Sequence, residues 1–213
     1  MNIKSIETLI DYIQQEKGWR TKELLNFKAR SLQIKGIDQN SLFKLGICLV
    51  YSHWEGFVKN ASVAFFTYLI KRGFKYNELL DNYKVCAYLE HFKGYPHKNF
   101  DASFKLVTNQ INFNTSIQID PLTFIDTKSN LNYENLHEIL RKIGLPLSPF
   151  ELKAKFLNET LLNFRNAISH GEYRKIDIDE FVHIFDETLI LIETFSNELE
   201  NFSVQKSFFR KNI

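Results

Sequence analysis

The chain has 213 residues, of which 44% are hydrophobic and 20 are Phe, so it can build a substantial core within one domain. Its formal net charge of +2 is too small for binding nucleic acid by bulk electrostatics, and any RNA site must be a local concentration of charge. The composition therefore excludes both a disordered chain and a strongly basic one.

The cysteines and the hydrophobic pattern predict the compartment. Cys48 and Cys86 lie in apolar helical stretches, with no Cys or His nearby at metal-binding spacing. This pattern favours reduced thiols, no structural metal and no cofactor. The N-terminus has no apolar signal core, and Lys44, Glu55 and Lys59 interrupt the most hydrophobic region well below membrane-spanning length. We expect a soluble, cytoplasmic protein that does not contact membranes.

The first half of the chain carries helical spacing throughout. Isoleucines recur at this spacing in a predicted helix over 3–16, which Gly18 is expected to end, and a second helix is expected over 21–32. The longest apolar pattern follows and predicts the central helix, which closes at Gly73 after two basic residues. Its apolar positions are Phe43, Ile47, Val50, Trp54, Phe57, Ala61, Phe65 and Tyr68.

The middle of the chain is less regular and is interpreted as an insertion over 77–132 within a helical bundle. Short helical pieces are expected over 77–92 and 103–111, separated by a turn at 94–96. Residues 116–120 alternate in polarity, which favours a short strand. Aromatic and lysine side chains interleave here and fit either stacking on unpaired bases or core packing: Tyr83, Lys84, Tyr88, Phe92, Lys93, Tyr95, Lys98 and Phe100.

Three further helices are predicted after the insertion. Asn132 can cap a helix over 133–143, and a second one is expected to begin at about Ser148. The last begins at Asp177 or Asp179 and is apolar over a broad arc, so it should be buried in the bundle or at a dimer interface. Basic residues in the tail, 203–213, indicate a flexible end. The fold class is all-α.

The helix expected from Ser148 ends in a cluster of polar groups. Arg165 and Ser169 flank its apolar stripe, whereas Asn166 and His170 lie on the side facing away from it. Gly171 follows at once and can adopt the left-handed conformation that stops a helix. The stripe consists of Leu157, Leu161, Phe164 and Ile168. The helix thus combines a core face with a polar face.

The spacing of Arg165 and His170 resembles the R-x4-6-H motif of the HEPN superfamily, which in many members is the active site of a metal-independent endoribonuclease. The block 52–59, Ser-His-Trp-Glu-Gly-Phe-Val-Lys, resembles the W-E-G long-helix signature of one bacterial branch, and residues 126–132 resemble that branch too. The resemblance implies an HEPN-like helical bundle acting as a toxin or antiphage effector, restrained by an antitoxin or another regulatory partner.

Metal-independent RNA cleavage needs proton transfer and positive charge on the phosphate. His170 can move a proton near pH 7, and the planar fork of Arg165 matches a phosphate. Asn166 and Ser169 can donate hydrogen bonds to phosphate oxygens or hold the imidazole. Because positions five apart on an ideal helix differ by roughly 140°, we expect a homodimer in which two copies of the motif form one composite site, as the family is understood to do.

Two further residues are supporting candidates. Glu55 lies in the middle of the central helix and could orient His170 or Arg165, or be an ordinary ion-paired glutamate. Tyr173 follows the motif, where modification by a nucleotidyltransferase that adds AMP would block the site.

Other interpretations of the motif remain open. His170 could simply cap the helix by bonding its last carbonyls, and Arg165 could form a surface ion pair with Glu172 or Asp177. At the level of the whole protein, the alternative is a non-catalytic HEPN-like module that binds RNA, a nucleotide or another protein.

Overall fold

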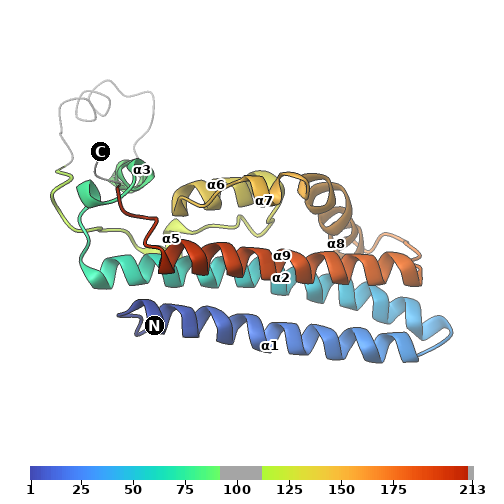
Figure 1. Ribbon diagram of the computed structural model, residues 1–213. Coiled ribbons are helices and arrows are strands. Elements are labelled where there is room, and N and C mark those ends of the chain that lie inside the picture. Colours follow the sequence, from blue (N-terminus) through green and yellow to red (C-terminus); the bar gives the residue numbers. More distant parts are fainter. Residues whose placement is uncertain (92–111, 211–213) are drawn as a thin grey trace, which may run out of the picture.

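The computed structural model describes residues 1–91 and 112–210 (Figure 1). Within these ranges the chain forms helices and two isolated β-bridges but no strand, which confirms the all-α prediction. The predicted turn at 94–96 and helix over 103–111 lie outside the described residues. No helix among those described is long and apolar enough to cross a membrane.

Helix α1 (Ile6–Gln33) begins at Ser5, whose side chain accepts the backbone N–H of Thr8 in a capping box. It runs unbroken through Gly18, so the prediction of two helices separated at that glycine was wrong. A glycine inside a helix costs only about 1 kcal/mol. Buried Ile13 and Leu24, on either side of Gly18, belong to the same core, and this packing outweighs the local preference.

Helix α2 (Ile37–Arg72) is the predicted central helix, ending at Gly73 in the left-handed conformation with φ 68°. It contacts α1 and α9 (Ile178–Val204) as well as the shorter helices α5 (Pro121–Phe124), α6 (Tyr133–Ile143) and α8 (Asn163–Ser169) (Figure 1). Trp54 is fully buried, as expected of a core residue. Because α2 contacts both groups of helices, its residues can reach the motif on one side and α1 on the other.

Helix α9 (Ile178–Val204) starts at Asp177, one of the two predicted caps, which forms a capping box with Glu180. It packs against α1 and α2. Phe181 stacks on Phe43 of α2 with ring centroids 4.1 Å apart. The broad apolar arc of α9 is therefore mostly used inside the chain, and it no longer argues for a dimer.

The 3-10 helix η1 (Tyr76–Glu78), α3 (Asp81–His91) and α5 (Pro121–Phe124) belong to the region interpreted as an insertion. Its described parts share the core, since Tyr83 is fully buried and donates a hydrogen bond to the Ile143 carbonyl. Tyr83 is thus a core residue and not a base-stacking one. The alternation over 116–120 yields a single bridge between Ser116 and Lys75 and no strand.

The tail prediction was wrong for residues 203–210. Phe208 is fully buried, Phe209 forms an isolated bridge with Leu79, and Arg210 makes an ion pair with Asp81. The prediction of a flexible end rested on the charged residues of the tail and did not consider its adjacent phenylalanines. Burying two aromatic rings provides enough apolar surface to order a short segment.

Helix α6 (Tyr133–Ile143) matches its prediction at both ends. The Asn132 side chain accepts the N–H of Asn135, and Gly144 stops the helix with φ 96°. These two signals depend on neighbouring residues alone, and therefore local sequence sufficed to place them.

Candidate functional site

The motif helix has an unexpected break. A continuous helix was predicted from about Ser148, but the structure has a short α7 (Ser148–Glu151), a π-helix η2 (Phe156–Leu162) and then α8 (Asn163–Ser169). The predicted apolar stripe is nevertheless buried at Leu157, Leu161 and Phe164. π-Helical turns are rare and occur often at functional sites. This one directly precedes the helix that carries Arg165.

The end of α8 follows the predicted geometry. Gly171 has φ 73°, and the N–H groups of Gly171 and Glu172 bond to the carbonyls of Ile168 (3.1 Å) and Ala167 (2.9 Å). These two bonds form a Schellman motif, which satisfies the last carbonyls through the backbone. The exposed His170 side chain makes no hydrogen bond or ion pair with any described residue. The imidazole therefore does not cap the helix, contrary to the alternative interpretation of this residue.

Arg165 is half-buried and rests on neutral groups. Its guanidinium carbon lies 4.7 Å from the ring centroid of Tyr51, and its nitrogens donate to Asn166 Oδ1 (2.8 Å) and, more weakly, to the Ser129 carbonyl (3.4 Å). In the part of the chain that is described, no carboxylate forms an ion pair with it, so neither alternative partner, Glu172 nor Asp177, is engaged. Its charge stays available to a ligand.

The supporting candidates separate into two groups. Asn166 contacts Arg165 directly, and Ser169 lies close to Cys48 of α2, whose thiol pKa is raised by burial. Glu55 accepts a hydrogen bond from Thr127 and lies beside Tyr51, and it makes no hydrogen bond or ion pair with Arg165 or His170, both of which the structure describes. The Tyr173 side chain is 92% exposed.

The residues that sequence reasoning missed lie under Arg165. Tyr51 is buried, with 1% of its surface exposed, and Leu131 N–H donates to its hydroxyl at 2.7 Å. Burial and the Glu55 carboxylate raise the pKa of Tyr51, so the phenol stays protonated. A signal was available, because Tyr51 lies one helical turn before Glu55 and immediately before the 52–59 block.

The family model described as RiboL-PSP-HEPN matches residues 15–201. This chain belongs to the RiboL-PSP-HEPN family. Comparisons with proteins of curated function and with solved structures find no match. HEPN membership suggests a ribonuclease-like or RNA-binding module, and the matched range contains the central helix and the whole Arg165 to His170 motif.

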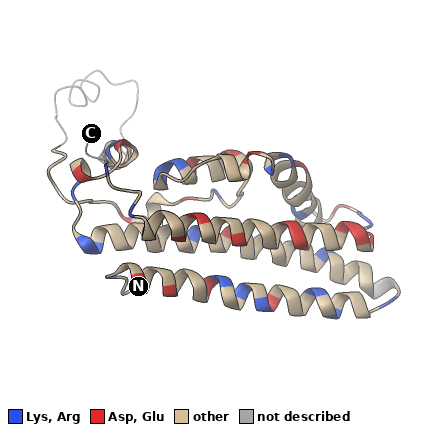
Figure 2. Cartoon of the chain, viewed as in Figure 1, with Lys and Arg blue, Asp and Glu red and all other residues tan. Residues whose placement is uncertain are grey.

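The charge around this RiboL-PSP-HEPN motif differs from that of the α1 and α9 surfaces. Lys17, Lys28 and Lys153 are paired with carboxylates of α9. Near the motif, Lys44 lies 5.4 Å from the Tyr173 ring centroid and Arg174 lies 3.4 Å from that of Phe164, and neither has an acidic partner among the described residues. Figure 2 shows both basic and acidic residues along α1, whereas α9 carries acidic residues and no Lys or Arg. The net charge of the whole chain therefore says little about any one surface.

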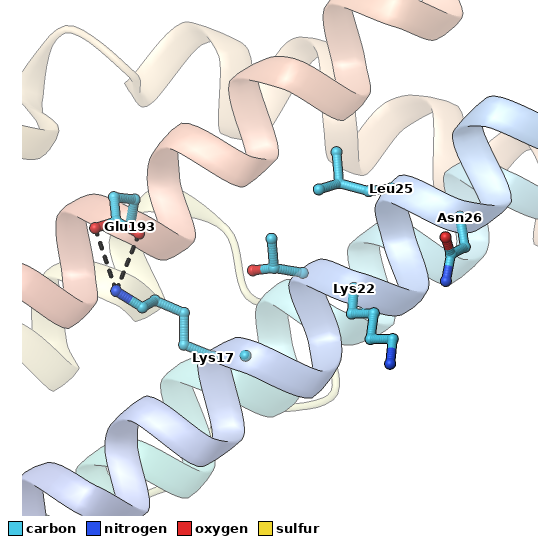
Figure 3. A pocket seen from close by; sticks show the side chains of 7 residues that line it. Lys17, Lys22, Leu25, Asn26 and Glu193 are labelled. Atoms are coloured by element: carbon cyan, nitrogen blue, oxygen red, sulfur yellow. Dashed lines mark hydrogen bonds and ion pairs between the residues drawn. The ribbon is translucent and has the colours of Figure 1, made fainter.

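Hollows elsewhere on the RiboL-PSP-HEPN fold do not coincide with this motif. One of about 410 Å³ lies between α1 and α9, where Lys17 pairs with Glu193 at one end and Leu25 lines the other (Figure 3). Another of about 640 Å³ is lined by α3 and α6. In residues 1–91 and 112–210, no group of three or more His, Cys, Asp or Glu side chains is arranged to hold a metal ion.

Proposed function

We propose that this protein is an endoribonuclease that cleaves RNA without a metal ion, with Arg165 and His170 as its catalytic residues. One observation carries the proposal. Arg165 holds a half-exposed guanidinium on neutral partners, five positions before an exposed imidazole that no described residue engages. An unneutralised fork suits a phosphate diester, and an unengaged imidazole is available for proton transfer.

The chemistry follows from the two side chains. A neutral His170 takes the proton of the 2′-hydroxyl, whose oxygen attacks the adjacent phosphorus, and the bond from phosphorus to the 5′-oxygen breaks. The departing oxygen receives a proton from a protonated His170. Arg165 binds the non-bridging oxygens and stabilises the charge that develops on them. The products are a 2′,3′-cyclic phosphate and a 5′-hydroxyl end.

A homodimer would supply both protonation states. Two motifs related by a two-fold axis place two Arg165 and two His170 side chains in one cleft, which overcomes the angular separation within one helix. The exposed ring of Tyr173, three residues after His170, supports contact with a second copy, since this side chain is 92% exposed. Light scattering at micromolar concentration should give a dimer. A monomer that cleaves RNA at full rate would contradict the composite site.

The cellular role we propose is that of a cytoplasmic toxin or antiphage effector, restrained by an antitoxin or regulatory partner protein. The exposed hydroxyl of Tyr173 is accessible to a modifying enzyme such as one that transfers AMP. Expression in a bacterial host should arrest growth, and either Arg165→Lys or His170→Ala should relieve the arrest. Equal toxicity of all three proteins would contradict this role.

The enzymatic test uses purified protein and single-stranded RNA in excess EDTA. Cleavage that leaves 2′,3′-cyclic phosphate ends, and that His170→Ala removes, is the expected result. Loss of cleavage on chelation with recovery on adding magnesium would show a different mechanism. Binding of RNA without cleavage would instead identify the non-catalytic binding module.

A further inference from the structure

Arg165 depends on Tyr51 for its position. The tyrosine ring lies under the guanidinium at 4.7 Å, while the other contacts are one amide and one carbonyl. A long arginine side chain on a helix surface usually samples many rotamers, and ordering it costs entropy when it meets a ligand. A flat ring beneath the guanidinium group reduces this entropy cost, provided that the ring itself is held in place.

Tyr51 is held from two elements. Its hydroxyl accepts the N–H of Leu131, and the Glu55 carboxylate, one turn later on α2, lies close enough to raise the pKa of the phenol. Glu55 in turn accepts the hydroxyl of Thr127. Both Leu131 and Thr127 belong to the loop that follows α5. The ring is therefore fixed by its own helix and by this loop together.

The same loop has an unusual backbone. Lys128 and Ser129 both adopt left-handed conformations, with φ of 54° and 51°, which residues with side chains seldom do. The Asp126 carboxylate accepts the N–H of Lys128, and the Asn130 N–H bonds to the Thr127 carbonyl. This turn presents the Ser129 carbonyl to Arg165. Strained conformations persist where surrounding contacts determine them, and they concentrate at functional sites.

We propose that Tyr51 is a positioning residue that holds the guanidinium of Arg165 ready for an RNA phosphate, with Glu55 and the loop over 126–131 fixing Tyr51 in turn. This inference rests on the proposed ribonuclease function. Tyr51 is too deeply buried to touch substrate, so it acts through Arg165 alone. The uncharged Tyr51 ring orders the guanidinium group and leaves its positive charge unneutralised. A carboxylate partner would order the group but would neutralise its charge.

The test compares Tyr51→Leu, which removes the ring, with Tyr51→Phe, which keeps the ring and loses its hydroxyl anchors. Tyr83→Phe is the matched control, because Tyr83 is also buried and its hydroxyl also bonds the backbone, donating to the Ile143 carbonyl far from the motif in sequence. We expect kcat to fall about 10-fold for Tyr51→Leu and about 3-fold for Tyr51→Phe, with KM changed less, as for lost transition-state contacts. The control should match wild type.

Two readouts separate positioning from general damage to the fold. In the Arg165→Lys background, Tyr51→Phe should lower kcat no further, whereas a merely structural role would lower it in both backgrounds. The side-chain Nε–H signal of Arg165, assigned by its loss in Arg165→Lys, should be narrow and slow to exchange in wild type and should broaden in Tyr51→Phe. If Tyr51→Leu does not fold, these Tyr51→Phe measurements decide the question.

The outcomes distinguish this inference from the proposed function. If wild type fails to cleave RNA but the Arg165 signal still depends on Tyr51, the nuclease proposal fails and the positioning of Arg165 stands. If wild type cleaves RNA while folded Tyr51→Phe leaves both the Arg165 signal and kcat unchanged, Tyr51 does not position Arg165.

Discussion

Two arginines on opposite sides of α2 sit on aromatic rings, yet their surroundings differ. The guanidinium of Arg20 lies 4.3 Å from the Trp19 ring centroid, is buried, and pairs with Glu16 at 2.8 Å. Arg165 lies 4.7 Å from the Tyr51 ring centroid but pairs with no described carboxylate. One charge is neutralised inside the α1–α2 interface, and the other remains available to a ligand. The acidic partner, more than the ring, separates a structural arginine from a candidate catalytic one.

Residues 52–59, the block around Trp54, lie close to both Arg20 and the site around Arg165. Gly56 faces Arg20, since a Cβ added there would lie 3.1 Å from a guanidinium nitrogen. Glu55 lies next to Tyr51 beneath Arg165. Adjacent residues of one helix turn point in different directions, so a single short sequence block stabilises the α1–α2 interface and supports the candidate site.

The largest expected effect is the loss of stability caused by replacing Arg20, the arginine in the α1–α2 interface. Arg20→Ala leaves the Glu16 carboxylate mostly buried and without its cation, although Asn60 still donates to it. Breaking a buried pair in this way costs about 3–5 kcal/mol of the free energy of unfolding. Urea denaturation measures it. Lys22→Ala, an exposed position on the same helix, should change stability by less than about 0.5 kcal/mol, and equal effects of both would contradict the assignment of Arg20.

A smaller effect is expected from Arg165→Lys. The substitution keeps the charge but loses the fork, and losing one charged hydrogen bond to the phosphate, worth about 1.5–3 kcal/mol, corresponds to about a 10- to 100-fold lower kcat/KM. The free energy of unfolding should stay within about 0.5 kcal/mol of wild type. Arg141→Lys, on the exposed surface of α6, provides the control. Unchanged cleavage in Arg165→Lys would mean that any cation suffices there.

The smallest expected effect is the contribution of His53 to the pH dependence of the free energy of unfolding. Burial and the nearby Arg20 lower the pKa of His53, while the Glu23 carboxylate opposes them. Because unfolded His titrates near about 6.5, the unfolded state binds the proton first, and the free energy of unfolding falls as pH drops below that value. The slope from this one group is at most about 1.4 kcal/mol per pH unit.

Substituting the histidine isolates its contribution. His53→Gln should flatten the pH dependence of the unfolding free energy between pH 7.5 and 5.5, measured by urea denaturation at several pH values. Glu16 contributes separately at lower pH, because its pKa is lowered from a value that is already acidic. An identical slope in wild type and His53→Gln would show that the buried histidine does not carry the effect.

Local signals in the sequence predicted the most regular parts of the fold. The caps at Asn132 and Asp177 and the stops at Gly73, Gly144 and Gly171 depend on neighbouring residues, and each was placed from sequence. Gly18 has the same local signal, but long-range packing of α1 overrides it. Turn chemistry can be read from neighbouring residues, whereas the strength of tertiary packing cannot.

The candidate site was only partly accessible from sequence. Arg165, Asn166 and Ser169 lie on α8, within the region where the periodicity predicted a helix, and the spacing of Arg165 and His170 identified the motif. The residues in contact with Arg165 were not predicted, because Tyr51 and Ser129 are distant from it in sequence. The place of Tyr51 immediately before the 52–59 block was the one available signal, since the left-handed turn at Ser129 contains no glycine to indicate it. The homodimer and the roles of Arg165 and His170 remain predictions.

The central claim is that His170 transfers protons while Arg165 supplies positive charge. The most direct measurement is the single-turnover rate at which wild type and His170→Ala cleave a defined RNA. The RNA dissociation constant and the urea denaturation curve are recorded for both proteins. The account predicts a loss of roughly 100-fold or more in the cleavage rate, on the scale of general acid–base catalysis, with binding and stability close to wild type. Cleavage at the wild-type rate by folded His170→Ala would contradict it.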